Sequence, residues 1–116
     1  MLRRYWILIL YLVIASSTVF AADSASLFKA VNSNNVKEVR AILTDTPDLV
    51  GSMSGGGMTA LHIAAARGYG DIALLLIEKG ADVNARTIHD STPLSFAVVN
   101  NHPDVAMLLQ ENGGIQ

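Results

Sequence analysis

The stretch that decides the fold is Thr59–Gly80, TALHIAAARGYGDIALLLIEKG. It occurs again in modified form 33 residues later as Thr92–Gly113, TPLSFAVVNNHPDVAMLLQENG, and the two stretches align without a gap. Both keep a threonine, a leucine, an alanine, an aspartate, a glutamate and a final glycine at the same places. Such a repeat is typical of a solenoid, in which each unit buries its apolar side against its neighbours.

The first half of each copy predicts a short helix. Thr59 and Thr92 stand where an N-cap is needed, and Pro93 suits the first helical position because its missing N–H has no partner there anyway. Gly68 predicts the end of this helix in the first copy. Asn101, at the equivalent place in the second copy, can adopt the same left-handed conformation.

The second half of each copy predicts a longer helix. Asp71 and Asp104 are expected to open it, because a carboxylate is favourable at the positive end of the helix dipole. Gly80 predicts its end. Apolar residues at helical spacing are expected to face the core: Ile72, Ala73, Leu75 and Leu76.

A more divergent unit precedes these two copies. Residues 27–43 align with the first copy at an offset of 34, which pairs Leu27 with Leu61 and Ala30 with Ala64. Terminal repeats are often atypical because one of their faces meets water. Polar residues of this unit suit such an outward-facing end: Lys29, Asn32, Lys37 and Arg40.

These units resemble the ankyrin repeat family. Residues 59–65, TALHIAA, are similar to the family's Thr-Pro-Leu-His-x-Ala-Ala signature, and residues 80–85, GADVNA, are similar to the pattern that ends a repeat. The period of 33 also matches. The resemblance implies an all-α fold, an α-solenoid of about three helix-turn-helix repeats at 24–57, 58–90 and 91–116. The segment before them, residues 1–21, is predicted to be a signal peptide.

The first 21 residues predict that the protein is exported. Arg3 and Arg4 form a positive start, residues 5–14 are an unbroken apolar core, and residues 19–21 suit cleavage after Ala21. The expected destination is the periplasm of a Gram-negative bacterium or the eukaryotic secretory pathway. The alternative is an uncleaved membrane anchor, although the apolar run is near the lower limit for crossing ~30 Å of hydrocarbon.

Composition narrows the possible functions. From Ala22 onward, six Lys and Arg face ten Asp and Glu, a net charge of −4. Nucleic-acid binding requires a basic face, so a nucleic-acid partner is not expected. The chain has no cysteine, which excludes disulfides, thiol catalysis and cysteine-ligated zinc.

The loop at residues 51–58, GSMSGGGM, poses a separate question, because a glycine-rich loop before a helix is also typical of a phosphate site. A Walker-type loop that began at Gly51 would need a lysine at position 57, where Gly57 stands. In the ankyrin alignment Gly57 is the turn glycine. The loop is therefore predicted to be the turn between the first two repeats.

No other pattern predicts catalysis, a metal site or a cofactor. The histidines lack metal-ligand spacing and a carboxylate cluster: His62, His89 and His102. The loop serines have no convincing base: Ser52 and Ser54. Asp45 and Asp48 flank Pro47 in what is predicted to be an exposed turn, so they are interpreted as solvated carboxylates rather than an acid–base pair.

The resemblance also implies roles for particular residues. His62 is expected to tie the turn of its own repeat to the next, and Ser95 at the same place in repeat three is expected to weaken that tie. Family members usually bind proteins through a concave face. The equivalent positions here are Met58, Ala66, Arg67, Arg86, Ile88, His89, Ser91, Val99 and Asn100, with Asn32 and Ser33 as weaker equivalents. The alternative is that they are variable solvent positions.

Three hypotheses for function follow. The first is an exported adaptor without catalytic activity that protects, inhibits or scaffolds a protein. The second is a membrane-anchored subunit of an envelope complex that retains the leader. The third is a small-molecule-binding protein or enzyme that uses the 51–58 loop and His62. Weak self-association is also expected at the C-terminal end, where Phe96, Val98 and Met107 are predicted to be partly uncovered.

Overall fold

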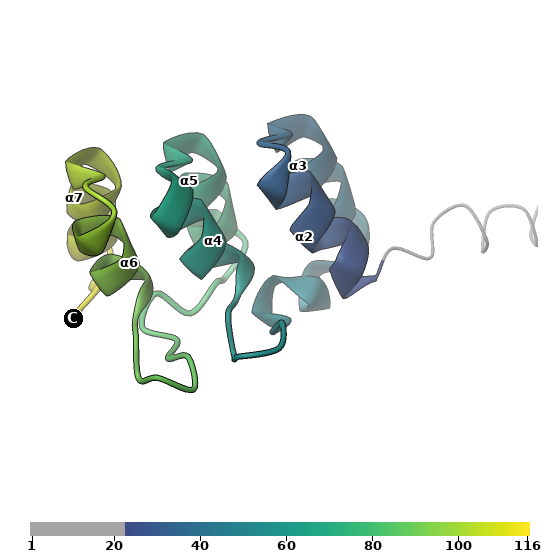
Figure 1. Ribbon diagram of the computed structural model, residues 1–116. Helices are drawn as coiled ribbons and strands as arrows, with labels where there is room; N and C mark the ends of the chain where they lie inside the picture. The colour runs from purple at the N-terminus through teal and green to yellow at the C-terminus, as the bar shows by residue number, and fades with distance from the viewer. Residues whose placement is uncertain (1–22) are drawn as a thin grey trace, which may run out of the picture.

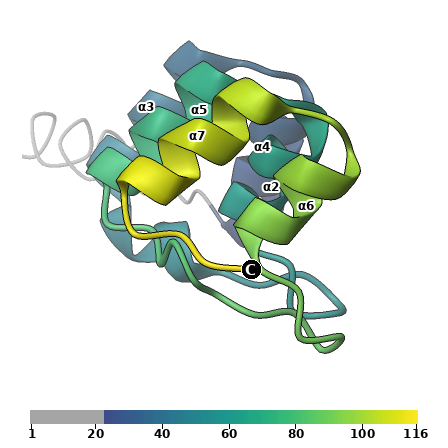
Figure 2. The same cartoon turned by 90° about the vertical axis from the view of Figure 1, so that its left-hand side faces the viewer.

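The computed structural model describes residues 23–116, which form three pairs of helices arranged in a row (Figure 1). The pairs are α2 (Ser24–Asn32) with α3 (Val36–Asp45), α4 (Ala60–Arg67) with α5 (Gly70–Glu78), and α6 (Pro93–Val99) with α7 (Pro103–Glu111). Seen along the row, α2, α4 and α6 form one layer, and α3, α5 and α7 form the other (Figure 2). The predicted all-α solenoid is confirmed.

Local signals in the sequence set the helix ends. The side-chain oxygens of Thr59 and Thr92 accept the backbone N–H three residues on, from His62 and Ser95, in two capping boxes. Gly68 ends α4 with a left-handed φ of 74°. Both predicted N-caps and the predicted helix end are therefore confirmed.

The second helix of each copy begins one residue earlier than expected, at Gly70 and Pro103. Asp71 and Asp104 still lie in the first turns, where their carboxylates favour the helix dipole. Asn101 has the predicted left-handed conformation, with φ 61°.

The linker after α3 differs from the predicted turn. Residues Pro47–Gly51 form a 3₁₀ helix, η1, with the proline at its start. Asp45 and Asp48 are exposed, as expected, but Leu49 and Val50 are half-buried against the core. Apolar packing therefore orders a segment whose proline and aspartates alone indicated a turn.

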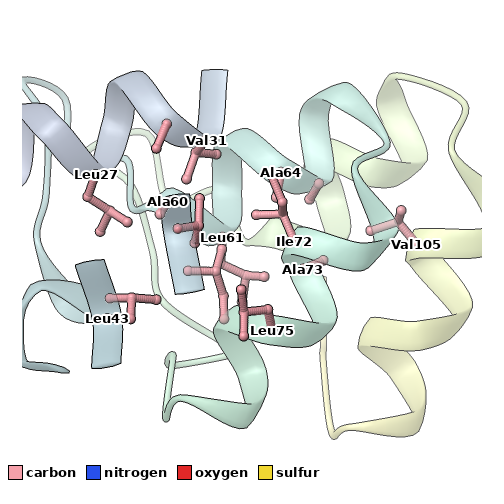
Figure 3. Packing of buried hydrophobic residues seen from close by; sticks show 14 of the residues in the cluster. Leu27, Val31, Leu43, Ala60, Leu61, Ala64, Ile72, Ala73, Leu75 and Val105 are labelled. Carbon is pink, nitrogen blue, oxygen red and sulfur yellow. The ribbon is translucent and has the colours of Figure 1, made fainter. Parts of the chain in front are cut away.

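The core runs through all three pairs without a break, from Leu27 to Leu109 (Figure 3). Leu61, Ile72 and Leu76 are at most 1% exposed. The interfaces between helices also contain small residues that are fully buried: Ala60, Ala64, Ala65 and Ala73. Because alanine has no bulk beyond Cβ, neighbouring helices can approach closely along the row.

The predicted signal peptide, residues 1–21, lies outside the described residues. Among residues 23–116, no helix has both the length and the apolar character needed to cross a bilayer.

Candidate protein-binding site

Two successive turns between the helix pairs are built alike. The first, residues 54–58, is closed by the Ser54 N–H, which donates to the Met58 carbonyl at 2.8 Å. The second, residues 87–91, is closed by the Thr87 N–H, which donates to the Ser91 carbonyl at 3.0 Å. The Ile88 N–H donates to the Gly56 carbonyl at 3.0 Å and joins the two turns.

Gly57 is required at the place where these turns meet. Its φ of 74° is left-handed, and a Cβ there would lie 3.3 Å from the Ile88 backbone nitrogen. A side chain would therefore be strained and would press on the second turn. The predicted role of Gly57 as the glycine of an inter-repeat turn is confirmed.

Asp90 occupies the equivalent left-handed position in the second turn, with φ 61°. The Arg86 Nη1 donates to the Asp90 carboxylate at 3.0 Å and to its carbonyl oxygen at 3.3 Å. Both side chains are exposed, so the ion pair contributes little to stability. The ion pair does hold the Arg86 side chain against the turn, and the Asp90 carboxylate partly neutralises its charge.

His62 holds the second turn against the second repeat. Its Nδ1 accepts the Thr59 N–H at 3.1 Å, so the ring proton belongs on Nε2, which donates to the Ser91 carbonyl at 3.0 Å. The side chain is fully buried, and this burial lowers the pKa of His62 below 6.5. The expected tie between repeats is confirmed.

Ser95 makes no such tie. Its hydroxyl contacts only the backbone of Thr92, where it accepts the N–H at 2.9 Å and donates to the carbonyl at 2.7 Å. The Thr92 hydroxyl instead donates to the Ile115 carbonyl at 2.6 Å. A serine is too short to reach beyond its own cap, so the weaker tie predicted for repeat three agrees with the structure.

A second histidine also links repeats two and three, and the sequence did not predict it. The His102 Nε2 lies 3.1 Å from the Ala66 carbonyl oxygen, and a Cβ on Gly68 would lie only 2.5 Å from His102 Nδ1. The absent side chain of Gly68 therefore makes room for the ring. Among the described residues, no hydrogen bond joins the first helix pair to the second.

We call the exposed side of α2, α4 and α6, together with the turns 54–58 and 87–91, the inner face. It contains two adjoining pockets. One, of about 220 Å³, is lined by Ser91, Ser95, Phe96, Val99 and Asn100. The other, of about 240 Å³, is lined by Gly55, Gly56, Met58, Thr87, His89, Ser91 and Phe96. Because Ser91 and Phe96 line both, we treat them as one double pocket.

The structure brings together five of the nine predicted binding residues in this double pocket: Met58, His89, Ser91, Val99 and Asn100. Val99 is 82% exposed. The other four predicted residues lie outside it. Ile88, Arg67 and Arg86 are exposed, and Ala66 is half-buried. The weaker equivalents Asn32 and Ser33 are exposed at the end of α2.

Phe96 is the main residue that sequence reasoning misplaced. It was expected at the C-terminal end with Val98 and Met107, but it lines both pockets and its ring meets His62 edge-on, with centroids 5.5 Å apart. Val98 and Met107, 49% and 60% exposed, line a separate hollow between α6 and α7. Helical spacing could have separated Phe96 from Val98, since two residues turn a helix by about 200°. Self-association through that hollow stays a prediction.

Charge is unevenly distributed between the two layers of helices. Helices α2, α4 and α6 contain no carboxylate, and their only charged residues are the exposed Lys29 and Arg67. The rest of residues 23–116 has four Lys and Arg against ten Asp and Glu. Even with Asp90 of the turn 87–91 included, the inner face is therefore the more positive side of an acidic chain. No cluster of three metal-ligating side chains occurs among the residues that the structure describes.

The family model for ankyrin repeats, which describes three copies of the repeat, matches residues 9–87 and 27–116. The chain is an ankyrin repeat protein. Ankyrin repeats form protein–protein interaction modules. This membership agrees with the helix pairs, the joined turns and the buried His62.

Similar ankyrin repeat regions occur in several larger proteins. The chain is 38% identical over 90 residues to a probable E3 ubiquitin-protein ligase, XBOS33, of Oryza sativa subsp. japonica, a match that covers 77% of this chain and 17% of the ligase. It is 35% identical over 82 residues to the serine/threonine-protein kinase VIK of Arabidopsis thaliana, covering 71% of this chain and 19% of the kinase. It is 50% identical over 42 residues to human protein fem-1 homolog C, a match that covers 36% of this chain and 7% of the human protein. The ankyrin repeat chain thus spans less than a fifth of the length of these relatives.

Proposed function

We propose that this protein is an exported adaptor without catalytic activity that binds another protein through its inner face, the side that is concave in the family. The observation that carries the proposal is the double pocket, which combines aromatic and aliphatic side chains with hydroxyl and amide groups. Such a mixture is typical of the centre of a protein-binding patch. His62 and His102 hold the surrounding turns and helices in place, so little ordering is needed on binding.

The most direct test is partner capture. Full-length protein would be cross-linked in its own host beside the double variant Arg67→Ala/Ile88→Asp. Ile88 is 74% exposed and Arg67 is also exposed, so the variant should keep its thermal stability and lose the partner. The matched control is Arg40→Ala/Leu74→Asp, which changes exposed residues of α3 and α5.

We expect one protein to be recovered by the wild type and the control, and lost by the inner-face variant. Equal recovery by all three proteins would place the interface away from the inner face and contradict the proposal. Unfolding of the Ile88→Asp single variant would show that Ile88 does not lie on an exposed turn.

The proposal that the protein is exported rests on residues 1–21. We expect a mass that corresponds to cleavage after Ala21, together with loss of tryptophan fluorescence, because Trp6 is the only tryptophan. Intact-mass spectrometry of protein isolated from its host measures this mass directly. A full-length mass in the membrane fraction would favour the second candidate, a membrane-anchored subunit of an envelope complex.

The small-molecule and enzyme hypotheses have less support. His62, the residue on which they depend, is fully buried and both ring nitrogens are engaged in hydrogen bonds. The ligase and kinase activities named for the relatives belong to much longer proteins, and we do not extend them to this chain.

A further inference from the structure

The double pocket is suited to side chains of a peptide. Its halves, about 220 and 240 Å³, share Ser91 and the Phe96 side chain as lining. Two side chains of one segment could therefore fill them together. Met58, Phe96 and Val99 supply apolar surface in the two halves. This composition favours apolar side chains as occupants.

One wall of the double pocket offers backbone rather than side chains. Gly55 and Gly56 line it, and a Cβ on either would meet no atom within 4 Å. Neither glycine N–H donates a hydrogen bond within residues 23–116. A partner backbone could approach this wall closely, and its carbonyls could accept from these N–H groups, as an added strand does at a sheet edge. In such an extended segment, side chains two residues apart point the same way, toward the two pockets.

The charge beside the double pocket favours an acidic segment. Arg67 occupies in α4 the place that Asn100 of the pocket occupies in α6, 33 residues later, and these two helices pack side by side. Arg67 has no ion-pair partner in the described part of the chain. Helices α2, α4 and α6 contain no carboxylate, and the one on the turns of the inner face, Asp90, is already paired with Arg86.

From this geometry we propose that the double pocket binds an extended segment of the partner protein, with two apolar side chains in the two halves and a carboxylate facing Arg67. The proposal rests on the proposed function, because it specifies what the inner face recognises. It adds a conformation, a spacing of two residues between the apolar side chains, and a charge.

The experiment is selection from a phage library of random 12-residue peptides on purified full-length protein. We expect enrichment of peptides with apolar residues at i and i+2 and an Asp or Glu beside them. Gly55→Trp tests the pocket, since position 55 has open space and no left-handed φ and therefore tolerates a side chain. Arg67→Glu tests the charge, and Arg40→Glu on the exposed side of α3 is the matched control.

Peptides selected on the wild type should lose binding to Gly55→Trp and bind Arg67→Glu about tenfold more weakly, while Arg40→Glu binds them as the wild type does. Selection on Arg67→Glu should enrich Lys and Arg in place of the acids. The inference is overturned if no sequence is enriched, or if enriched peptides bind all variants equally. If this happens while the captured partner is still lost by Arg67→Ala/Ile88→Asp, the adaptor function stands without the extended acidic segment. If that variant also keeps the partner, the proposed function fails too.

Discussion

Replacing Leu76 with alanine should lower the free energy of unfolding by about 2–5 kcal/mol, measured by urea denaturation of the wild type and the variant. Leu76 is fully buried in α5 of the middle repeat, which packs against α3, α4 and α7, so the shortened side chain leaves a cavity in the core. Small domains have only about 5–15 kcal/mol of stability in total. The variant is therefore expected to be partly unfolded near body temperature.

Leu74→Ala is the matched control, because the same change is made two residues away on the same helix. Leu74 is 43% exposed, and its loss should cost well under half as much as that of Leu76. Equal destabilisation by the two changes would mean that the apolar side of α5 is not packed as the structure has it.

Lowering the pH from 7.5 to 5 should destabilise the protein through His62. Burial lowers the pKa of His62, against the opposing influence of the Ser91 and Ala85 backbone and of the Asp82 charge. The neutral ring also fits its partners, since Nδ1 must stay free of a proton to accept the Thr59 N–H. Protonation would place a charge in the core that these groups only partly compensate, and it would break this bond.

The sign of the effect follows from the direction of the pKa shift. The unfolded chain binds a proton at His62 with the ordinary pKa near 6.5, and the folded chain binds it less readily. The stability that the protein gains from burying neutral His62 is therefore fully present above about pH 6.5. It is lost as the pH falls below that value toward the folded-state pKa. Urea midpoints at the two pH values should show the loss.

The control for acid sensitivity is His62→Gln, which keeps an acceptor and a donor but does not titrate. Its stability at pH 7.5 should be lower than that of the wild type, and its pH dependence should be smaller. His89 and His102 remain in both proteins, so the difference isolates His62. The same pH dependence in the variant and the wild type would show that His62 is not the group responsible.

Most of the fold could be predicted because the signals that set it are local and repeated. Thr59 and Thr92 cap their helices through atoms three residues away, and Gly68 and Asn101 end helices through their own backbone conformation. The 33-residue offset then places each unit against the next. The 3₁₀ helix at 47–51 could not be predicted in this way, since it depends on Leu49 and Val50 packing against residues distant in sequence.

The candidate site could be predicted only in part. Positions carried over from the family located five residues of the double pocket, but not its central ring, Phe96. Whether a surface position lines a pocket depends on residues of the neighbouring repeat, which the sequence of one repeat does not contain. The pocket wall, for example, exists because Gly55 and Gly56 of one turn face His89 of the next across a space that no side chain fills. The contact of His102 with Ala66 and Gly68 likewise joins residues more than 30 positions apart.

The histidine contacts also determine the order in which the stack comes apart. The second and third helix pairs are joined by directional hydrogen bonds from His62 and His102, whereas the first pair meets the second through apolar packing, with Tyr69 at the place of His102. A hydrogen bond weakens steeply once its geometry is lost, so these two bonds resist small movements between the second and third helix pairs. The last two repeats should therefore open as one cooperative unit, and the first should fray independently of them at lower free energy. Apart from the wall formed by Gly55 and Gly56, the double pocket lies within the part that stays closed longest.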